Sequence, residues 1–152
     1  MVPNAQFQIA EIQVSYNPPV AVCQRPQICS SQEAYQIFLD SWDAGKLELL
    51  EQFKILLLNR ANRVLGLYEV SSGGISETTA DPKLIFSVAL KAAASSLVLC
   101  HNHPSGNLKP SQDDLHLTQK FKAAGQLLGI VVLDHVILTR EGYYSFADEG
   151  AL

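Results

Sequence analysis

The amino-acid sequence predicts a single α/β domain. Short apolar runs typical of buried strands alternate along the chain with amphipathic stretches of helical length. Helix-start signals mark where several of the amphipathic stretches begin: a cap residue followed by proline, or by a glutamate three positions on. The 152 residues are about the size of one domain, and no linker divides them.

The first part of the chain contains one weak strand signal and one strong helix signal. Residues Ile9–Val14 alternate weakly between apolar and polar side chains, which predicts an early strand. The prolines of Asn17–Pro19 interrupt any regular element there. Ser30 and Glu33 have capping-box spacing, so a helix is expected to begin at Ser30 and to end at Asp43–Gly45.

The middle of the chain predicts a hairpin followed by a helix. Phe53–Leu58 is a short apolar run that fits a buried strand, and Val64–Val70 follows it after a turn as the partner strand. Asp81 then supplies a cap oxygen directly before Pro82, which is favoured at the first helical position. This helix is expected to continue to about Ala94.

The last part of the chain repeats the alternation of strand and helix. Ser96–Cys100 is predicted to be a buried strand, and the loop 101–110 follows it. A long helix is expected to begin near Ser111 and to end at Gly129. The final expected strands are Ile130–Thr139 and, after a turn, Tyr143–Phe146.

Composition narrows the classes of partner and the compartment. The chain carries 11 Lys and Arg against 15 Asp and Glu, with no basic run. Nucleic-acid binders usually present a basic patch, so direct DNA binding is expected to be weak or absent. The cysteines Cys23, Cys29 and Cys100 are odd in number and lack zinc-finger spacing. With no signal-peptide pattern and no apolar run near the ~20 residues that span a bilayer, we expect a cytoplasmic protein without a membrane segment.

The loop after the third predicted strand carries the clearest chemical signal. His101 and His103 stand at i and i+2, so in extended geometry both imidazoles point to one face. Asp114 follows in the first turn of the next predicted helix, which can turn it toward the same point. Two histidines and one carboxylate leave the fourth position of a tetrahedral zinc open for water, which is typical of a catalytic zinc site.

Simpler interpretations apply to single residues of this group. Ser111 and Asp114 form S-x-x-D ahead of an apolar helix, which by itself indicates a helix cap. Asp113 is a rival carboxylate, about 100° away around the helix. His116 lies roughly opposite Asp114 and is expected to face solvent. The complete constellation favours a metal site, and Ser111 can cap the helix and serve the site together.

Residues 101–106 (HNHPSG) with 111–114 (SQDD) resemble the JAMM motif of the MPN metallopeptidases, in its RadC-like branch. The stretches 56–66 (LLLNRANRVLG) and 127–138 (LLGIVVLDHVIL) are also similar to that branch. The resemblance covers about residues 30–152. It implies one MPN-type domain there, with a mixed β-sheet flanked by helices in a cytidine-deaminase-like architecture. Residues 1–29 are then an N-terminal extension or strand.

The resemblance also implies roles for individual residues. It implies a zinc ion held by His101, His103 and Asp114, one per chain, and a glutamate before a buried strand as general base. Glu51 fits that description; Glu69 is the second candidate, and weaker ones are Glu48 and Glu77. Ser111 is expected to donate a hydrogen bond to the oxyanion. Ser105 and His135 are expected to orient a ligand or to contact substrate, although a simply buried His135 fits as well.

Two functions from different classes follow from the resemblance. One is a zinc-dependent hydrolase that cleaves peptide or isopeptide bonds of a peptide or protein substrate. The other is a non-catalytic or partner-dependent zinc module associated with DNA repair or recombination. Residues 1–29 show no helix-hairpin-helix pattern, which longer RadC-like chains carry. The zinc deaminase signature is absent, and the resemblance to HNH nucleases is accidental. The sequence leaves the substrate and the oligomeric state open.

Overall fold

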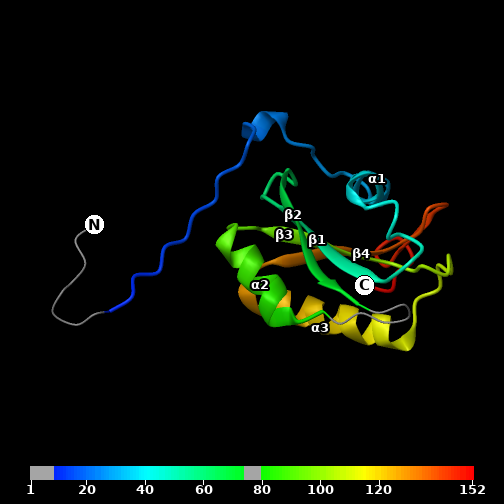
Figure 1. Ribbon diagram of the computed structural model, residues 1–152. Coiled ribbons are helices and arrows are strands. Elements are labelled where there is room, and N and C mark those ends of the chain that lie inside the picture. The colour runs from blue at the N-terminus through cyan, green and yellow to red at the C-terminus, as the bar shows by residue number, and fades with distance from the viewer. Residues whose placement is uncertain (1–8, 74–79) are drawn as a thin grey trace.

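A mixed β-sheet organises the chain, as seen in a computed structural model that describes residues 9–73 and 80–152 (Figure 1). The order of the strands across the sheet is β2-β1-β3-β4-β5. Their bounds are β1 Gln52–Leu58, β2 Val64–Ser72, β3 Ser96–Asn102, β4 Val131–Leu138 and β5 Tyr143–Ser145. Strand β1 is antiparallel to β2 and β3, β3 is parallel to β4, and β4 is antiparallel to β5. The predicted α/β architecture with a mixed sheet is therefore confirmed.

Helices cover both faces of this sheet. Helix α1 spans Ser31–Ser41, α2 spans Pro82–Lys91 and α3 spans Gln112–Leu128, and a short 3-10 helix, η1, spans Val22–Gln24. Figure 1 shows α2 and α3 on one side of the sheet and α1 on the other. Within the described part of the chain, no helix combines the length and the apolar character that crossing a membrane requires.

Two hydrophobic layers form the core, one on each face. Phe53, Ile55 and Leu99 pack under α2 and α3. Leu56 and Cys100 pack on the opposite face, under α1. Strands β1 and β3 are buried along their whole length, because they lie inside the sheet with helices on both sides. This explains why their sequences are almost continuously apolar.

The helix starts agree with the sequence prediction. Ser30 and Glu33 form a reciprocal capping box at the start of α1. The carboxylate of Asp81 accepts a hydrogen bond from the main-chain N–H of Lys83 at the start of α2. These contacts satisfy main-chain donors that would otherwise have no partner in the first turn. Helix α3 ends as predicted, with Gly129 in the left-handed conformation at φ 69°.

Several predicted bounds are wrong. Residues Ile9–Val14 form no strand but an exposed, extended segment, because no other strand lies beside them to complete a ladder. Helix α1 ends at Ser41, before the predicted stop. Helix α2 ends at Lys91 instead of Ala94, where the chain turns through Ala93 with φ 53°. Strand β3 continues two residues beyond Cys100, so that His101 belongs to the strand.

The close packing of α3 against β4 gives a stability prediction. A Cβ at Gly125 would lie 2.3 Å from the carbonyl oxygen of Ile130, so Gly125→Ala must displace the backbone. We expect the free energy of unfolding to fall by about 1–3 kcal/mol, as for other overpacked sites. Gly66→Ala is the matched control, since a Cβ there meets nothing within 4 Å. Equal midpoints for both variants in denaturant unfolding would contradict this account of the packing.

Candidate metal centre

Strand β3 places two imidazoles side by side at its carboxyl end. His101 is the second-last residue of β3, and His103 follows the strand directly. Their Nε2 atoms are 3.0 Å apart, which confirms that the two side chains share one face. The ring of Phe53, directly across the ladder in β1, stacks on the His101 ring at 5.9 Å between centroids. His101 is buried, whereas His103 is partly open to solvent.

The first turn of α3 brings a carboxylate to these imidazoles. Asp114 Oδ1 lies 3.2 Å from His101 Nε2, and Asp114 Oδ2 lies 3.6 Å from His103 Nε2. Oδ2 also accepts a hydrogen bond from the main-chain N–H of Ser111 at 2.8 Å. In return, the Ser111 hydroxyl accepts from the N–H of Asp114 at 3.0 Å. The helix cap and the histidine contacts are therefore made by the same carboxylate.

The charges of this group support one another. Burial alone would raise the pKa of the Asp114 carboxyl, but the adjacent imidazoles of His101 and His103 hold that pKa well below its usual range. Burial likewise opposes a charge on His103, yet the adjacent Asp114 carboxylate and the carbonyl of Asn107 raise its pKa. Asp114 is thus an anion at neutral pH, which is the form that binds a cation.

The donor set fits a divalent metal ion. His101, His103 and Asp114 each offer one ligand atom, and these atoms all lie within 4.8 Å of one another. His103 Nδ1 donates to the carbonyl oxygen of Asn107 at 2.5 Å, so its Nε2 keeps the lone pair that a metal needs. Two imidazoles and one carboxylate form a three-ligand set that leaves one tetrahedral position open.

A third buried histidine contacts the first. His135 Nε2 lies 2.8 Å from His101 Nδ1, and His135 Nδ1 lies 2.6 Å from the hydroxyl of Thr118 in α3. Burial and the neighbouring His101 lower the pKa of His135 well below its usual value, so this ring is neutral. The sequence pattern indicates a role for His135 but not for Thr118, whose only signal is its position one helical turn after Asp114.

Asn102 connects the metal ligands to the segment before β1. Its side chain points to the face opposite the imidazoles and is fully buried. The amide nitrogen donates to the carbonyl oxygens of Leu47 and Leu50, at 2.8 and 2.9 Å. The amide oxygen accepts from the main-chain N–H of Gln52 at 2.7 Å. These three bonds hold the chain on both sides of Glu51.

Glu51 directly precedes β1, on the side of the sheet that carries the imidazoles. Phe53 pairs with His101 in the antiparallel β1–β3 ladder, so the same register continued by two residues sets Glu51 opposite His103. The Glu51 side chain is half-buried, and its charge is one of the causes that raise the pKa of His103. Its carbonyl oxygen accepts a hydrogen bond from Gly73 at 2.9 Å. The ladder register and the electrostatic effect on His103 place this glutamate near the candidate ligands.

The other candidate glutamates are placed differently. Glu69 pairs with Lys54 and accepts a hydrogen bond from Gln52 Nε2 at 3.2 Å, so it lies on the sheet face away from the imidazoles. Glu48 lies at the surface, in an ion pair with Arg140 at 3.0 Å. Glu77 lies outside the described residues. Among the candidate glutamates that the structure describes, Glu51 is therefore the one on the same sheet face as the imidazoles.

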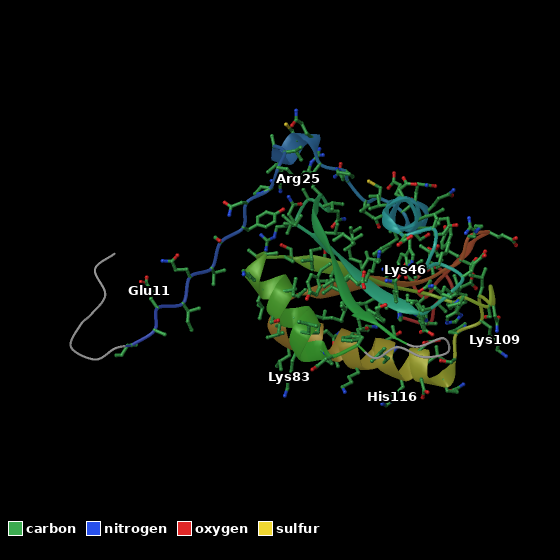
Figure 2. All side chains as sticks on the ribbon, in the orientation of Figure 1. Glu11, Arg25, Lys46, Lys83, Lys109 and His116 are labelled. Carbon is green, nitrogen blue, oxygen red and sulfur yellow. The ribbon has the colours of Figure 1, made fainter. Side chains whose placement is uncertain are left out.

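Of the remaining predicted residues, one lines a pocket beside the site and the others lie at the surface. A pocket of about 390 Å³ opens beside His103, and Ser105, Glu48 and Arg140 are among the residues that line it. Ser111 is exposed at the helix cap. Figure 2 shows His116 on the outer side of α3, where it faces solvent as expected. Asp113 is also exposed, so Asp114 is the carboxylate that faces the histidines.

The α/β fold and the histidine-carboxylate cluster define the class of a JAB-type metal-site domain. Residues 28–151 match the family described as RadC-like JAB domain, and the chain belongs to this family. It is 45% identical over 124 residues to a UPF0758 protein of Flavobacterium johnsoniae, covering 82% of this chain and 53% of that protein. A UPF0758 protein of Clostridium kluyveri is 37% identical over 126 residues, with coverage of 83% and 54%.

A third relative, a UPF0758 protein of Porphyromonas gingivalis, is 46% identical over 103 residues, covering 67% of this chain and 45% of that protein. The chain thus matches about half the length of these curated relatives. Their names state no activity. Family membership and fold are therefore shown by the comparisons, whereas the reaction has to be argued from the site.

The donor set makes a prediction about metal uptake. Asp114→Asn keeps an oxygen for the Ser111 N–H but loses the anionic ligand, so bound metal should fall from about one ion per chain to near zero. Asp113→Asn removes the same charge one residue away and should bind like the wild type. Elemental mass spectrometry after dialysis against Zn²⁺ measures both. Equal metal content in the two variants would show that Asp114 is only a helix cap.

The hydrogen bonds of Asn102 make a stability prediction. Asn102→Ala leaves buried main-chain groups without partners, at about 1–3 kcal/mol for each unsatisfied group, so the free energy of unfolding should fall by at least ~2 kcal/mol. Asn107→Ala is the control, since this exposed asparagine caps only Lys109 through its side chain. Denaturant unfolding compares them. If both variants unfold at the wild-type midpoint, Asn102 does not hold the segment around Glu51.

Proposed function

We propose that this chain is a zinc-dependent hydrolase that cleaves peptide or isopeptide bonds. The observation that carries the proposal is the convergence of one ligand atom each from His101, His103 and Asp114 within 4.8 Å, with Glu51 two residues before Phe53, the ladder partner of His101. Zinc prefers this mixture of imidazole and carboxylate ligands, and a three-ligand set is typical of catalytic zinc sites. When bound there, zinc lowers the pKa of a water molecule toward about 7.

Side chains of the protein itself supply the proton transfers, the contact to the oxyanion and the substrate pocket. Glu51 accepts the proton of the attacking water and returns it to the leaving amine, as a general base and then a general acid. The Ser111 hydroxyl accepts from the N–H of Asp114, so its hydrogen is left to donate to the oxyanion of the tetrahedral intermediate. Ser105 lines the pocket beside His103, where the substrate chain binds.

The surface and composition support a peptide or protein substrate over DNA. The formal net charge is −4, and the pocket beside His103 contains both Arg140 and two glutamates, Glu48 and Glu141. A phosphate backbone would meet repulsion from this acidic surface. We propose a cytoplasmic location, because Cys23, Cys29 and Cys100 are all unbridged thiols, which persist in reducing compartments.

The role of Glu51 makes the decisive prediction. Glu51→Gln should bind zinc normally but lose hydrolysis by roughly 10²–10⁴-fold, because the amide cannot accept the proton. Glu69→Gln is the matched control; it removes the same charge on the other face of the sheet and should keep its activity. Zinc content and turnover of peptide and isopeptide libraries are measured on both variants and the wild type.

The opposite pattern, with activity lost in Glu69→Gln and kept in Glu51→Gln, would reassign the base. If all three proteins bind zinc and none cleaves any member of the libraries, the chain is a non-catalytic or partner-dependent zinc module.

A further inference from the structure

A buried row of hydrogen bonds connects the two ligand-bearing elements behind the metal site. It starts at His101 Nδ1, passes through both ring nitrogens of His135 and reaches the hydroxyl of Thr118, with steps of 2.8 and 2.6 Å. The Thr118 hydroxyl then donates to the main-chain carbonyl oxygen of Asp114 at 2.6 Å. Asp114 Oδ1 in turn faces His101 Nε2, so this series of contacts returns to the histidine at which it began.

The donors and acceptors of this row can be assigned in one way only. A main-chain carbonyl oxygen is an acceptor without a proton, so the single hydrogen of the Thr118 hydroxyl goes to Asp114. His135 Nδ1 must then carry a proton and donate it to Thr118 Oγ1. The buried His135 ring bonds to a hydroxyl and an imidazole and to no carboxylate among the described residues, so a second ring proton is disfavoured and Nε2 accepts from His101. His101 must therefore hold its proton on Nδ1.

We propose that Thr118 and His135 are positioning residues that fix His101 in the tautomer with its lone pair on Nε2. The inference rests on the proposed zinc site, because Nε2 can bind zinc through a lone pair only when the ring proton is held on Nδ1. His103 obtains the same tautomer from the Asn107 carbonyl. Both histidines thus keep a lone pair on Nε2. For His101 it is fixed by the buried relay, which consists of His135 and Thr118. For His103 it is fixed by the carbonyl of its own loop.

Burial is what lets the relay decide the tautomer. Thr118 and His135 are both 0% exposed, so no water can take the place of either partner. The ring of Phe146 stacks on His135 at 4.6 Å between centroids, and Phe53 packs against it at 5.6 Å. These aromatic rings hold the imidazole in one orientation. The relay also joins β3, β4 and the first turns of α3, which carry or flank all three ligands.

Loss of the Thr118 hydroxyl should change which ring nitrogen of His101 carries the proton. In Thr118→Val the His135 Nδ1 proton would have no acceptor, so His135 is better satisfied by carrying its proton on Nε2 and donating to His101 Nδ1. The His101 proton then moves to Nε2, where it blocks the metal. Thr118→Ser keeps the hydroxyl and is the conservative control. Valine matches threonine in shape, so this pair of variants separates hydrogen bonding from packing.

The test measures tautomers and zinc affinity. Imidazole ¹⁵N spectra of the metal-free wild type should show the His101 proton on Nδ1, and Thr118→Ser should match. Thr118→Val should shift His101 toward the Nε2-protonated form and weaken zinc binding by about 10–100-fold in competition with a chelator, the usual effect of losing a residue that orients a ligand. A wild-type His101 that carries no proton on Nδ1 would overturn the proposal, whatever the variants do.

Wild-type zinc affinity in Thr118→Val would also overturn it. Neither measurement requires turnover, so the inference and the proposed function fail separately. A wild type that shows the Nδ1 proton and whose zinc affinity depends on Thr118, but that cleaves nothing, contradicts only the hydrolase. An active wild type whose Thr118→Val variant keeps both spectrum and affinity contradicts only the relay.

Discussion

Strand β3 runs through the middle of the sheet, and its side chains must alternate between two buried layers. Phe53 of β1 lies across from His101, which is directed with Leu99 toward α2 and α3. Cys100 and Asn102 are directed toward α1. This strict alternation is why two histidines separated by one residue can share a metal. For the same reason the side chain of Asn102, which lies between them, points to the other face and bonds to the segment before β1.

The site depends on polar groups that each serve two purposes. The Asp114 carboxylate caps α3 through the Ser111 N–H and faces both imidazoles. Its main-chain carbonyl oxygen receives the Thr118 hydroxyl, which links it to His135. A displacement of the first turn of α3 would therefore alter the cap, the ligand and the relay together. Such coupling keeps the three candidate ligands in one fixed geometry, which a metal site would require.

Local signals explain why much of this arrangement could be predicted. Capping boxes, proline at a first helical position and apolar runs act over a few residues, so they identified all three helix starts and the strands β1 to β5. The pair His101 and His103 depends only on the period of a strand. Asp114 follows from its place in the first turn of a helix. The resemblance to the RadC-like family depended on the same residues, and the family match over 28–151 confirms it.

The sequence by itself determined the elements and the three candidate ligands, since their signals are carried by near neighbours in the chain. Only the tertiary structure decided which glutamate faces the site, because strand order and register direct Glu51 and Glu69 to different environments. It also revealed Thr118 and left Ile9–Val14 without a strand. Each of these outcomes depends on contacts between segments far apart in sequence, and no local pattern encodes such contacts.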